Sequence, residues 1–366
     1  MSSCFGENIR VSVAGESHGE ALGVIIDGLP AGFQIDMEAL SAFMKRRAPG
    51  QNRFSTPRKE GDKPEFLSGL RENVMTGAPL LAVIRNTNTR SADYNALRDV
   101  PRPGHADFTA EMRYGGFQDA RGGGHFSGRL TAPLCIAGGI ARQMLLEKGI
   151  SVFALIKSVH GVEGEMPAYR KEEEDALRKI AEKPFPVWDD AAGEKMQAEI
   201  EKACMAEDSV GGVIEIAVLG MPKGIGSPMF DRMECKIASF AFGVPAVRGV
   251  EFGNGFDAAK LLGSENNDSF YFDEDGDIKT KTNRHGGLLG GITTGMPLIY
   301  RVAIKPTPSI FKEQDSVSLT EKKNTKLSIK GRHDPCIVQR AVPVMEAVTA
   351  LAVLDALMAP DSIWKK

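Results

Sequence analysis

Residues 341–359, with the sequence AVPVMEAVTALAVLDALMA, form the longest apolar tract of the chain. Pro343, Glu346 and Asp355 interrupt this tract, whereas a helix that spans a membrane needs about 20 nearly uncharged residues. The tract therefore predicts a helix that is buried in a protein core. Residues 129–148 are also too rich in apolar side chains for a surface helix, and they predict a second buried helix that ends at the glycine that follows.

Short strand-like stretches lie on both sides of these two helices. An amphipathic helix is predicted after Asp36, which is a plausible N-cap, and Pro49 and Gly50 end it. The strand-like stretches are 9–13, 24–26, 80–84, 213–219 and 298–305. Strands and helices do not alternate in a regular βαβ order, so the sequence predicts an α+β fold and not a doubly wound Rossmann sheet.

The size of the chain, 366 residues, allows one large domain or two smaller ones. We expect a single domain over 1–366. Residues 165–208 differ in character, because they hold a charge run followed by apolar residues at helical spacing. They predict a charged helical excursion on the surface of that domain.

The net charge of −3 disfavours binding to nucleic acid, because no positive field covers the whole chain. The five cysteines contain no C-x-x-C pair and predict reduced thiols. A strand-like stretch begins almost at once, which leaves no room for a signal peptide. We therefore expect a cytoplasmic protein with no membrane segment and no bound metal.

The segment Gly15-Glu16-Ser17-His18-Gly19 follows the first strand and places a carboxylate, a hydroxyl and an imidazole in consecutive positions. It matches the Gly-x-Ser-x-Gly pattern of hydrolases, which makes a serine hydrolase built on Ser17 one alternative. That pattern needs a helix after the serine, whereas an apolar strand follows here. A tight turn with a surface histidine is the other alternative.

Two further loops combine glycine with histidine. Residues 102–107, RPGHAD, place His105 between an arginine and an aspartate that could set its charge. Residues 121–129, RGGGHFSGR, run directly into a predicted helix. Consecutive glycines before a helix can bind an anion through backbone N–H groups, or they can serve as a flexible hinge.

Arginines are the other recurrent feature, and the planar guanidinium suits phosphate and carboxylate ligands. Three of them surround the Pro49-Gly50 pair, one opens the helix after the glycine run, and one lies in the segment 331–335; these are Arg46, Arg47, Arg53, Arg129 and Arg332. The residues thus predict an enzyme that acts on a small polyanion with a phosphorylated cofactor. A non-catalytic protein that binds flavin or phosphate remains an alternative.

Taken together, these motifs resemble the chorismate synthase family. The matching blocks are 15–30, 102–107 and 332–347, with 86–88, 121–124, 249–253 and 305–307 between them. The likeness extends from residue 6 to about residue 355. It implies a helical core packed between antiparallel β-sheets, and a homotetramer.

The resemblance also implies the reaction. The family eliminates phosphate from 5-enolpyruvylshikimate 3-phosphate to give chorismate and requires reduced FMN, with no net change of redox state. His18 would protonate the departing phosphate and His105 the reduced flavin, while Asp334 and Ser17 would assist removal of the C6 proton. Arg46, Arg47, Arg53 and Arg129 would hold the substrate.

Flavin contacts are implied in the same way. They are His125, Phe126, Ser127, Pro245, Ala246, Gly290, Lys305, Pro306, Thr307, Pro308, Ser309 and Arg332. Many family members have Arg-Ser-Ser where this chain has residues 125–127, HFS, and a third arginine where this chain has Ala48. Some relatives reduce their own flavin with NADPH. The length leaves no further nucleotide-binding unit, which favours an external flavin reductase.

Overall fold

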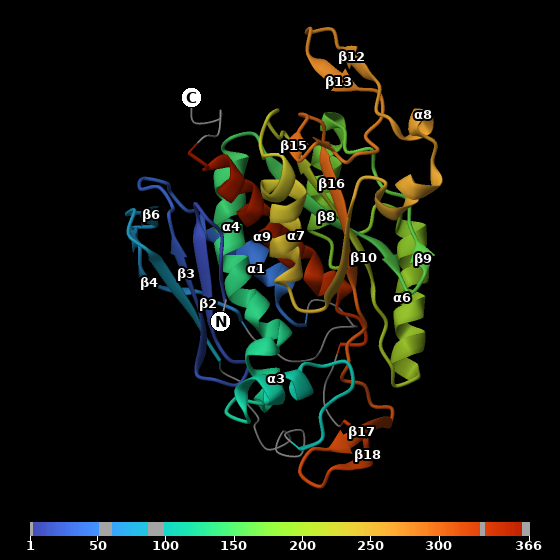
Figure 1. Ribbon diagram of the computed structural model, residues 1–366. Helices are drawn as coiled ribbons and strands as arrows, with labels where there is room; N and C mark the ends of the chain where they lie inside the picture. Colours follow the sequence, from blue (N-terminus) through green and yellow to red (C-terminus); the bar gives the residue numbers. More distant parts are fainter. Residues whose placement is uncertain (1–2, 51–60, 87–98, 330–333, 361–366) are drawn as a thin grey trace.

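The computed structural model describes residues 3–50, 61–86, 99–329 and 334–360. Two five-stranded sheets lie on opposite sides of a layer of helices (Figure 1). Every strand pairing within these two sheets is antiparallel. The prediction of an α+β fold with helices between antiparallel sheets is therefore confirmed.

The first sheet holds the N-terminal strands in the order β1-β2-β3-β7-β4. Along β3 the side chains of Leu22, Val24 and Ile26 are buried and alternate with more exposed neighbours, so one face of the sheet meets the core. The predicted strands at 9–13, 24–26 and 80–84 correspond to β2, β3 and β7. The bounds are β1 Cys4–Phe5, β2 Arg10–Gly15, β3 Ala21–Asp27, β4 Glu65–Ser68 and β7 Leu80–Arg85.

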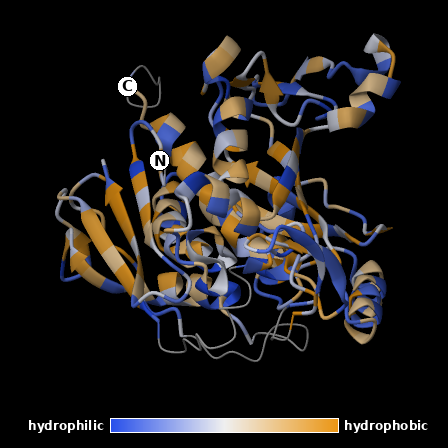
Figure 2. Cartoon of the chain, turned by 60° about the horizontal axis from the view of Figure 1, so that its bottom comes forward, coloured by the Kyte–Doolittle hydropathy of each residue, from blue (hydrophilic) through white to orange (hydrophobic). Residues whose placement is uncertain are grey.

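The second sheet is covered on both faces. Its strand β8 is almost completely buried because α9 packs on one face and α5 on the other, and α6 contacts β8 and β9 as well. Figure 2 shows hydrophobic residues concentrated in the strands and the central helices. The order is β11-β16-β10-β8-β9, with bounds Val247–Phe252, Leu298–Ile304, Gly212–Leu219, Ser151–Val159 and Val162–Glu163.

Both predicted core helices form, and they pack closely against each other. They are α4 (Thr131–Leu146) and α9 (Val338–Leu357). A Cβ atom on Gly138 of α4 would lie 2.3 Å from the Cα atom of Ala347 on α9, so only glycine permits this approach. The helix predicted after Asp36 is α1 (Met37–Arg47), and the Asp36 side chain caps it by accepting from two backbone N–H groups.

The two acidic residues of the apolar tract are fully buried, and each has cationic partners. Glu346 accepts two hydrogen bonds from Arg46, at 2.7 and 2.8 Å, and lies 3.4 Å from Arg142. Asp355 accepts from the backbone N–H groups of residues 7–9 and from Lys236. These pairs explain how α9 carries charges inside the core. Within the described ranges, no helix is long and apolar enough to cross a bilayer.

The remaining elements lie around these layers. The helices α5 and α6 occupy the segment 165–208, and the apolar face of α6 packs against the second sheet. The single-domain division of the chain stays a prediction. An acidic hairpin of β12 and β13 projects from the body (Figure 1). Further bounds are α3 Asp107–Tyr114, α5 Glu174–Ala181, α6 Asp190–Met205, α7 Met233–Phe242, α8 Gly263–Asn266, β5 Leu70–Arg71, β6 Val74–Met75, β12 Phe270–Phe272, β13 Ile278–Thr280, β14 Leu288–Leu289, β15 Ile292–Thr293, β17 Gln314–Ser318 and β18 Lys323–Leu327.

Candidate active site

A cavity of about 1390 Å³ opens where loops from both sheets meet the first turn of α4. A typical pocket for one small ligand has roughly 300–1,000 Å³, so this cavity has room for two. Most of the residues singled out in the sequence line it. These are Ser17, His18, Arg47, His105, His125, Phe126, Ser127, Arg129, Pro245, Ala246, Lys305, Thr307, Pro308, Ser309 and Asp334.

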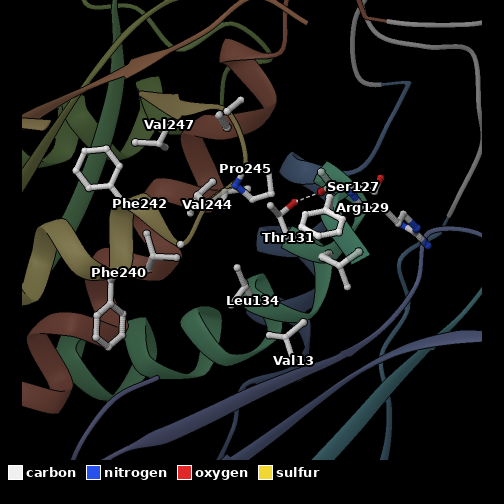
Figure 3. A pocket seen from close by; sticks show the side chains of 18 of the residues that line it. Val13, Ser127, Arg129, Thr131, Leu134, Phe240, Phe242, Val244, Pro245 and Val247 are labelled. Atoms are coloured by element: carbon white, nitrogen blue, oxygen red, sulfur yellow. Dashed lines mark hydrogen bonds between the residues drawn. The ribbon is translucent and has the colours of Figure 1, made fainter. Parts of the chain in front are cut away.

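One part of the cavity is apolar. Figure 3 shows Val13 and Leu134 on one side of it and Phe240 and Val244 on the other. Ser127, Arg129 and Thr131 stand at the entrance to α4, where the apolar part meets the charged part (Figure 3). A ligand with a flat apolar body and an anionic end would match this division.

His105 is held by a network within its own loop. Its Nδ1 lies 2.6 Å from the Asp107 carboxylate, which accepts only, so Nδ1 carries a proton. Arg102 donates to the same carboxylate through Nε at 2.7 Å and through its terminal nitrogen at 2.8 Å. Burial alone would raise the pKa of Asp107, but the bonds from Arg102 and His105 outweigh it and hold that pKa far below its usual value. Asp107 therefore stays ionised and fixes the imidazole.

His18 lies in the turn between β2 and β3, is almost fully buried, and faces the glycine run. A Cβ atom on Gly122 would lie 2.0 Å from His18 Nδ1, and one on Gly123 would lie 3.1 Å from the His105 ring. Gly122, Gly123 and Gly124 all have positive φ. The run thus passes close to both histidines, and within it the Gly123 N–H donates to the Ala120 carbonyl. The predicted anion cradle stays a prediction.

The turn that holds Ser17 connects two adjacent strands, so a strand and not a helix follows it. A hydrolase elbow needs the serine at a turn from strand to helix. The hydrolase alternative therefore lacks the backbone geometry that it requires.

Two arginines from different elements converge beside the cavity. Arg47, at the end of α1, donates to Asp62 at 2.5 Å, to Thr131 Oγ1 at 3.2 Å and to the Gly128 carbonyl at 3.3 Å. Arg129 donates to the other oxygen of the same Asp62 carboxylate and to Asn86. Burial would raise the pKa of Asp62, but the charges of both arginines lower it overall.

A third arginine, Arg340 of α9, joins Asp334 to this cluster. Its terminal nitrogen donates to Asp334 at 2.5 Å, and its Nε donates to the backbone carbonyl of Arg47 at 3.3 Å. Arg340 and Asp334 both line the cavity. Lys305, which also lines the cavity, donates to the Gly104 carbonyl, and burial lowers its pKa, helped by the nearby charge of Arg248.

Three of the residues singled out in the sequence lie away from the cavity lining. Arg46 donates to Glu346 in the core and does not line the cavity, which disfavours the contact with substrate that was predicted for it. Gly290 lies in the β14–β15 turn, and Pro306 stands between lining residues without lining the cavity itself. Arg53 and Arg332 lie outside the described residues.

The structure also adds residues that sequence reasoning missed. Arg340 and Arg248 line the cavity. Asp62 does not line it but accepts from two arginines that do, Arg47 and Arg129. Arg340 lies six residues after Asp334, in the first turn of α9, and this nearness in the chain is a signal that the sequence offered. Among the residues that the structure describes, no group of three or more acidic, histidine or cysteine side chains is arranged to hold a metal ion.

A buried histidine, a second histidine that a carboxylate orients, and converging arginines define an enzyme that performs acid–base chemistry on an anionic substrate. The family model of chorismate synthase matches residues 9–358. The chain belongs to the chorismate synthase family. This membership makes it a carbon–oxygen lyase that acts on a phosphate ester, and it gives no support to the hydrolase and non-catalytic alternatives.

Curated relatives and a solved structure agree with this assignment. The chain is 45% identical over 355 residues to the chorismate synthase of Dehalococcoides mccartyi strain BAV1, covering 97% of this chain and 96% of that protein. It is 43% identical over 366 residues to the chorismate synthase of Methanocaldococcus jannaschii, covering 98% and 97%. A crystal structure of chorismate synthase superimposes with a TM-score of 0.74 at 26% identity, covering 96% of this chain and 92% of that one.

Proposed function

We propose that this protein eliminates phosphate from 5-enolpyruvylshikimate 3-phosphate to give chorismate, the last step of the shikimate pathway to aromatic amino acids, with reduced FMN as cofactor. The observation that carries the proposal is that His18, His105, Arg47 and Arg129 all line one cavity. The reaction removes the 3-phosphate and a C6 proton, so it needs anion binding and proton transfer at the same place.

The cavity suits FMN in size and in chemistry. When bound, reduced FMN supplies electron density that helps phosphate leave and takes it back afterwards. The apolar walls seen in Figure 3 match a flat ring system, and Lys305 offers a cation for a phosphate. We assign to flavin binding the lining residues His125, Phe126, Ser127, Pro245, Ala246, Lys305, Thr307, Pro308 and Ser309. Gly290, Pro306 and Arg332 are kept as flavin contacts by family resemblance alone.

One of the predicted flavin contacts, His125, has other partners as well. His125 Nδ1 lies 2.8 Å from the Gly15 carbonyl, and its Nε2 lies 2.6 Å from the Ser3 hydroxyl. The imidazole thus joins the start of the first sheet to the glycine run. We propose that position 125 supports the flavin site mainly through its backbone.

The substrate carries a phosphate and two carboxylates, and the arginines provide matching cations. Arg47, Arg129 and Arg340 converge at the charged end of the cavity. We assign the first two to substrate binding, add Arg340, and keep Arg53 by resemblance. His18 protonates the departing phosphate, and His105, oriented by Asp107, donates its proton toward the flavin. Asp334, held by Arg340, and Ser17 assist removal of the C6 proton.

An anaerobic assay with purified protein and 5-enolpyruvylshikimate 3-phosphate tests this function. Phosphate and chorismate should form in equal amounts when FMN is reduced, with no stoichiometric consumption of reductant. The matched control contains oxidised FMN and should give no product. Equal turnover with oxidised flavin would contradict the proposed mechanism.

A pair of neighbouring arginines tests the substrate assignment. Arg47→Lys keeps the charge but loses the planar fork, so substrate binding should weaken by about 1–3 kcal/mol, the scale of a hydrogen bond to a charged group. Arg46→Lys changes the adjacent residue, which faces Glu346, and should leave the substrate Kd unchanged. Isothermal titration measures both. Loss of flavin binding with normal substrate binding in Arg47→Lys would show that this cluster binds the other ligand.

We further propose a cytoplasmic homotetramer that receives reduced FMN from an external reductase. Large apolar side chains are exposed on the single chain, among them Phe117, Phe230 and Phe256. Such side chains are typical of surfaces that a second copy covers. Within the described residues, none of the five cysteines forms a disulfide, which fits a reducing compartment.

A further inference from the structure

Two consecutive arginines at the end of α1 have the same kind of partner in two different places. Arg46 and Arg142 meet the buried Glu346 inside the core, whereas Arg47 and Arg129 meet the buried Asp62 at the wall of the cavity. The side chains of both acids are completely inaccessible to solvent. Only the Asp62 group has arginines that line the cavity.

The Asp62 carboxylate divides its two oxygens between the two arginines. Oδ2 accepts from Arg47 and Oδ1 accepts from Arg129. Two guanidinium groups brought to one place repel each other, and a shared carboxylate offsets this repulsion and fixes their orientation. Arg47, Arg129 and Asp62 together keep a net charge of about +1, so the three residues still attract an anion.

Among the described residues, the partners of Arg47 leave N–H groups of its guanidinium to spare for a ligand. Of the five donors in a guanidinium, three donate to Asp62, Thr131 and the Gly128 carbonyl within the part of the chain that the structure describes. Asp62 does not itself line the cavity, so it binds Arg47 and Arg129 from the side away from the ligand.

The backbone at Asp62 points to the same conclusion. Its φ is +42°, in the left-handed region, which costs energy for residues other than glycine and is tolerated best by Asn and Asp. Strain of this kind persists where the surroundings require a particular side chain in a particular place. Here the carboxylate is placed between two arginines that belong to elements far apart in the sequence.

We propose that Asp62 is a positioning residue for the substrate: it holds Arg47 and Arg129 together as one anion-binding unit. This inference rests on the proposed assignment of these arginines to the substrate. It assigns a role to a residue that touches neither substrate nor flavin. Asp62 is therefore expected to affect substrate affinity and to leave flavin affinity unchanged.

Asp62→Asn tests the proposal, because asparagine matches aspartate in size and accepts the same backbone conformation. The Kd of 5-enolpyruvylshikimate 3-phosphate, measured by isothermal titration, should rise by about 10- to 100-fold. The Kd of FMN, measured by titration of its fluorescence, should stay within about twofold. An unchanged or lower substrate Kd would overturn the proposal, and a lower value would mean that Asp62 competes with the substrate for the arginines.

A double variant separates positioning from a general loss of structure. If Asp62 acts through Arg47, the losses of substrate affinity in Asp62→Asn and Arg47→Lys overlap. The double variant should then have about the same substrate Kd as whichever single variant binds the substrate less tightly. Fully additive losses would show that Asp62 acts elsewhere. If Arg47→Lys weakens binding but Asp62→Asn does not, only this inference fails. If neither variant weakens binding, the proposed substrate site fails with it.

Near-ultraviolet circular dichroism and the unfolding midpoint establish that each variant is folded. Arg46→Lys is the matched control, because it alters the neighbouring arginine and its buried acid without altering the cavity wall. Should Asp62→Asn fail to fold, Asp62→Glu keeps the charge and moves the carboxylate. The same weakening of substrate binding is expected from it, and normal binding would refute the requirement for this geometry.

Discussion

Gly122→Ala should lower kcat by about 10²–10⁴-fold in a protein that still folds, because the new methyl group takes the place of the His18 imidazole. A Cβ atom at this position would lie 2.0 Å from His18 Nδ1 and 2.9 Å from Ser17 Oγ. Non-bonded atoms cannot approach so closely, and the His18 side chain is the part that can move away. The loss of kcat should therefore match that of a variant without the His18 side chain. Steady-state formation of chorismate measures it.

The control must separate this contact from the cost of the backbone conformation. Gly122 has a φ of +60°, and alanine in the left-handed region costs about 1–2 kcal/mol. Gly149, just after the other end of α4, has a φ of +73° with no atom near its Cβ position. Gly149→Ala should lose similar stability in urea unfolding and retain kcat. An equal loss of kcat in both variants would attribute the effect to the backbone and not to His18.

Much of the site could be predicted from the sequence, because its histidines lie in contiguous motifs. A loop with glycine next to His18 or His105 carries its own signal, and the folded chain brings both loops to one cavity. The two core helices and the antiparallel strands were predictable for a similar reason. Their apolar patterns are local, and buried elements must show them.

What the sequence could not predict depends on contacts between distant segments. Arg46 and Arg47 are neighbours, yet consecutive helical residues point about 100° apart, so one faces the core and the other the cavity. Nothing near Asp62 in the sequence indicates that it pairs with Arg129, 67 residues away. The glycine run suggested an anion cradle, whereas its closeness to two histidines follows only from the fold.

The second large effect concerns the two histidines. His18→Ala and His105→Ala should each reduce kcat by about 10²–10⁴-fold, the usual contribution of a positioned acid, and leave substrate binding largely intact. Binding persists because the arginines that hold the substrate, Arg47 and Arg129, are unaltered. Isothermal titration of the substrate and steady-state kinetics give the two quantities separately.

The two variants should nevertheless fail in different ways. His105 is oriented by Asp107, whose lowered pKa keeps it ionised far below neutral pH, so the carboxylate holds the Nδ1 proton and leaves Nε2 as the ring nitrogen for proton transfer. Without His105, the protonation-sensitive absorption of the bound reduced flavin should shift. Without His18, that absorption should stay as in the natural protein while release of phosphate slows in a single-turnover experiment.

Asp107→Asn provides the matched variant for this assignment. It leaves the imidazole in place but replaces the acceptor of the Nδ1 proton with an amide, so the ring loses its fixed orientation. The flavin absorption should shift in the same direction as in His105→Ala, with a smaller loss of kcat. If His105→Ala gives an unaltered flavin spectrum and near-normal turnover, the loop at 102–107 is structural, and Arg102 and Asp107 serve only to fold it.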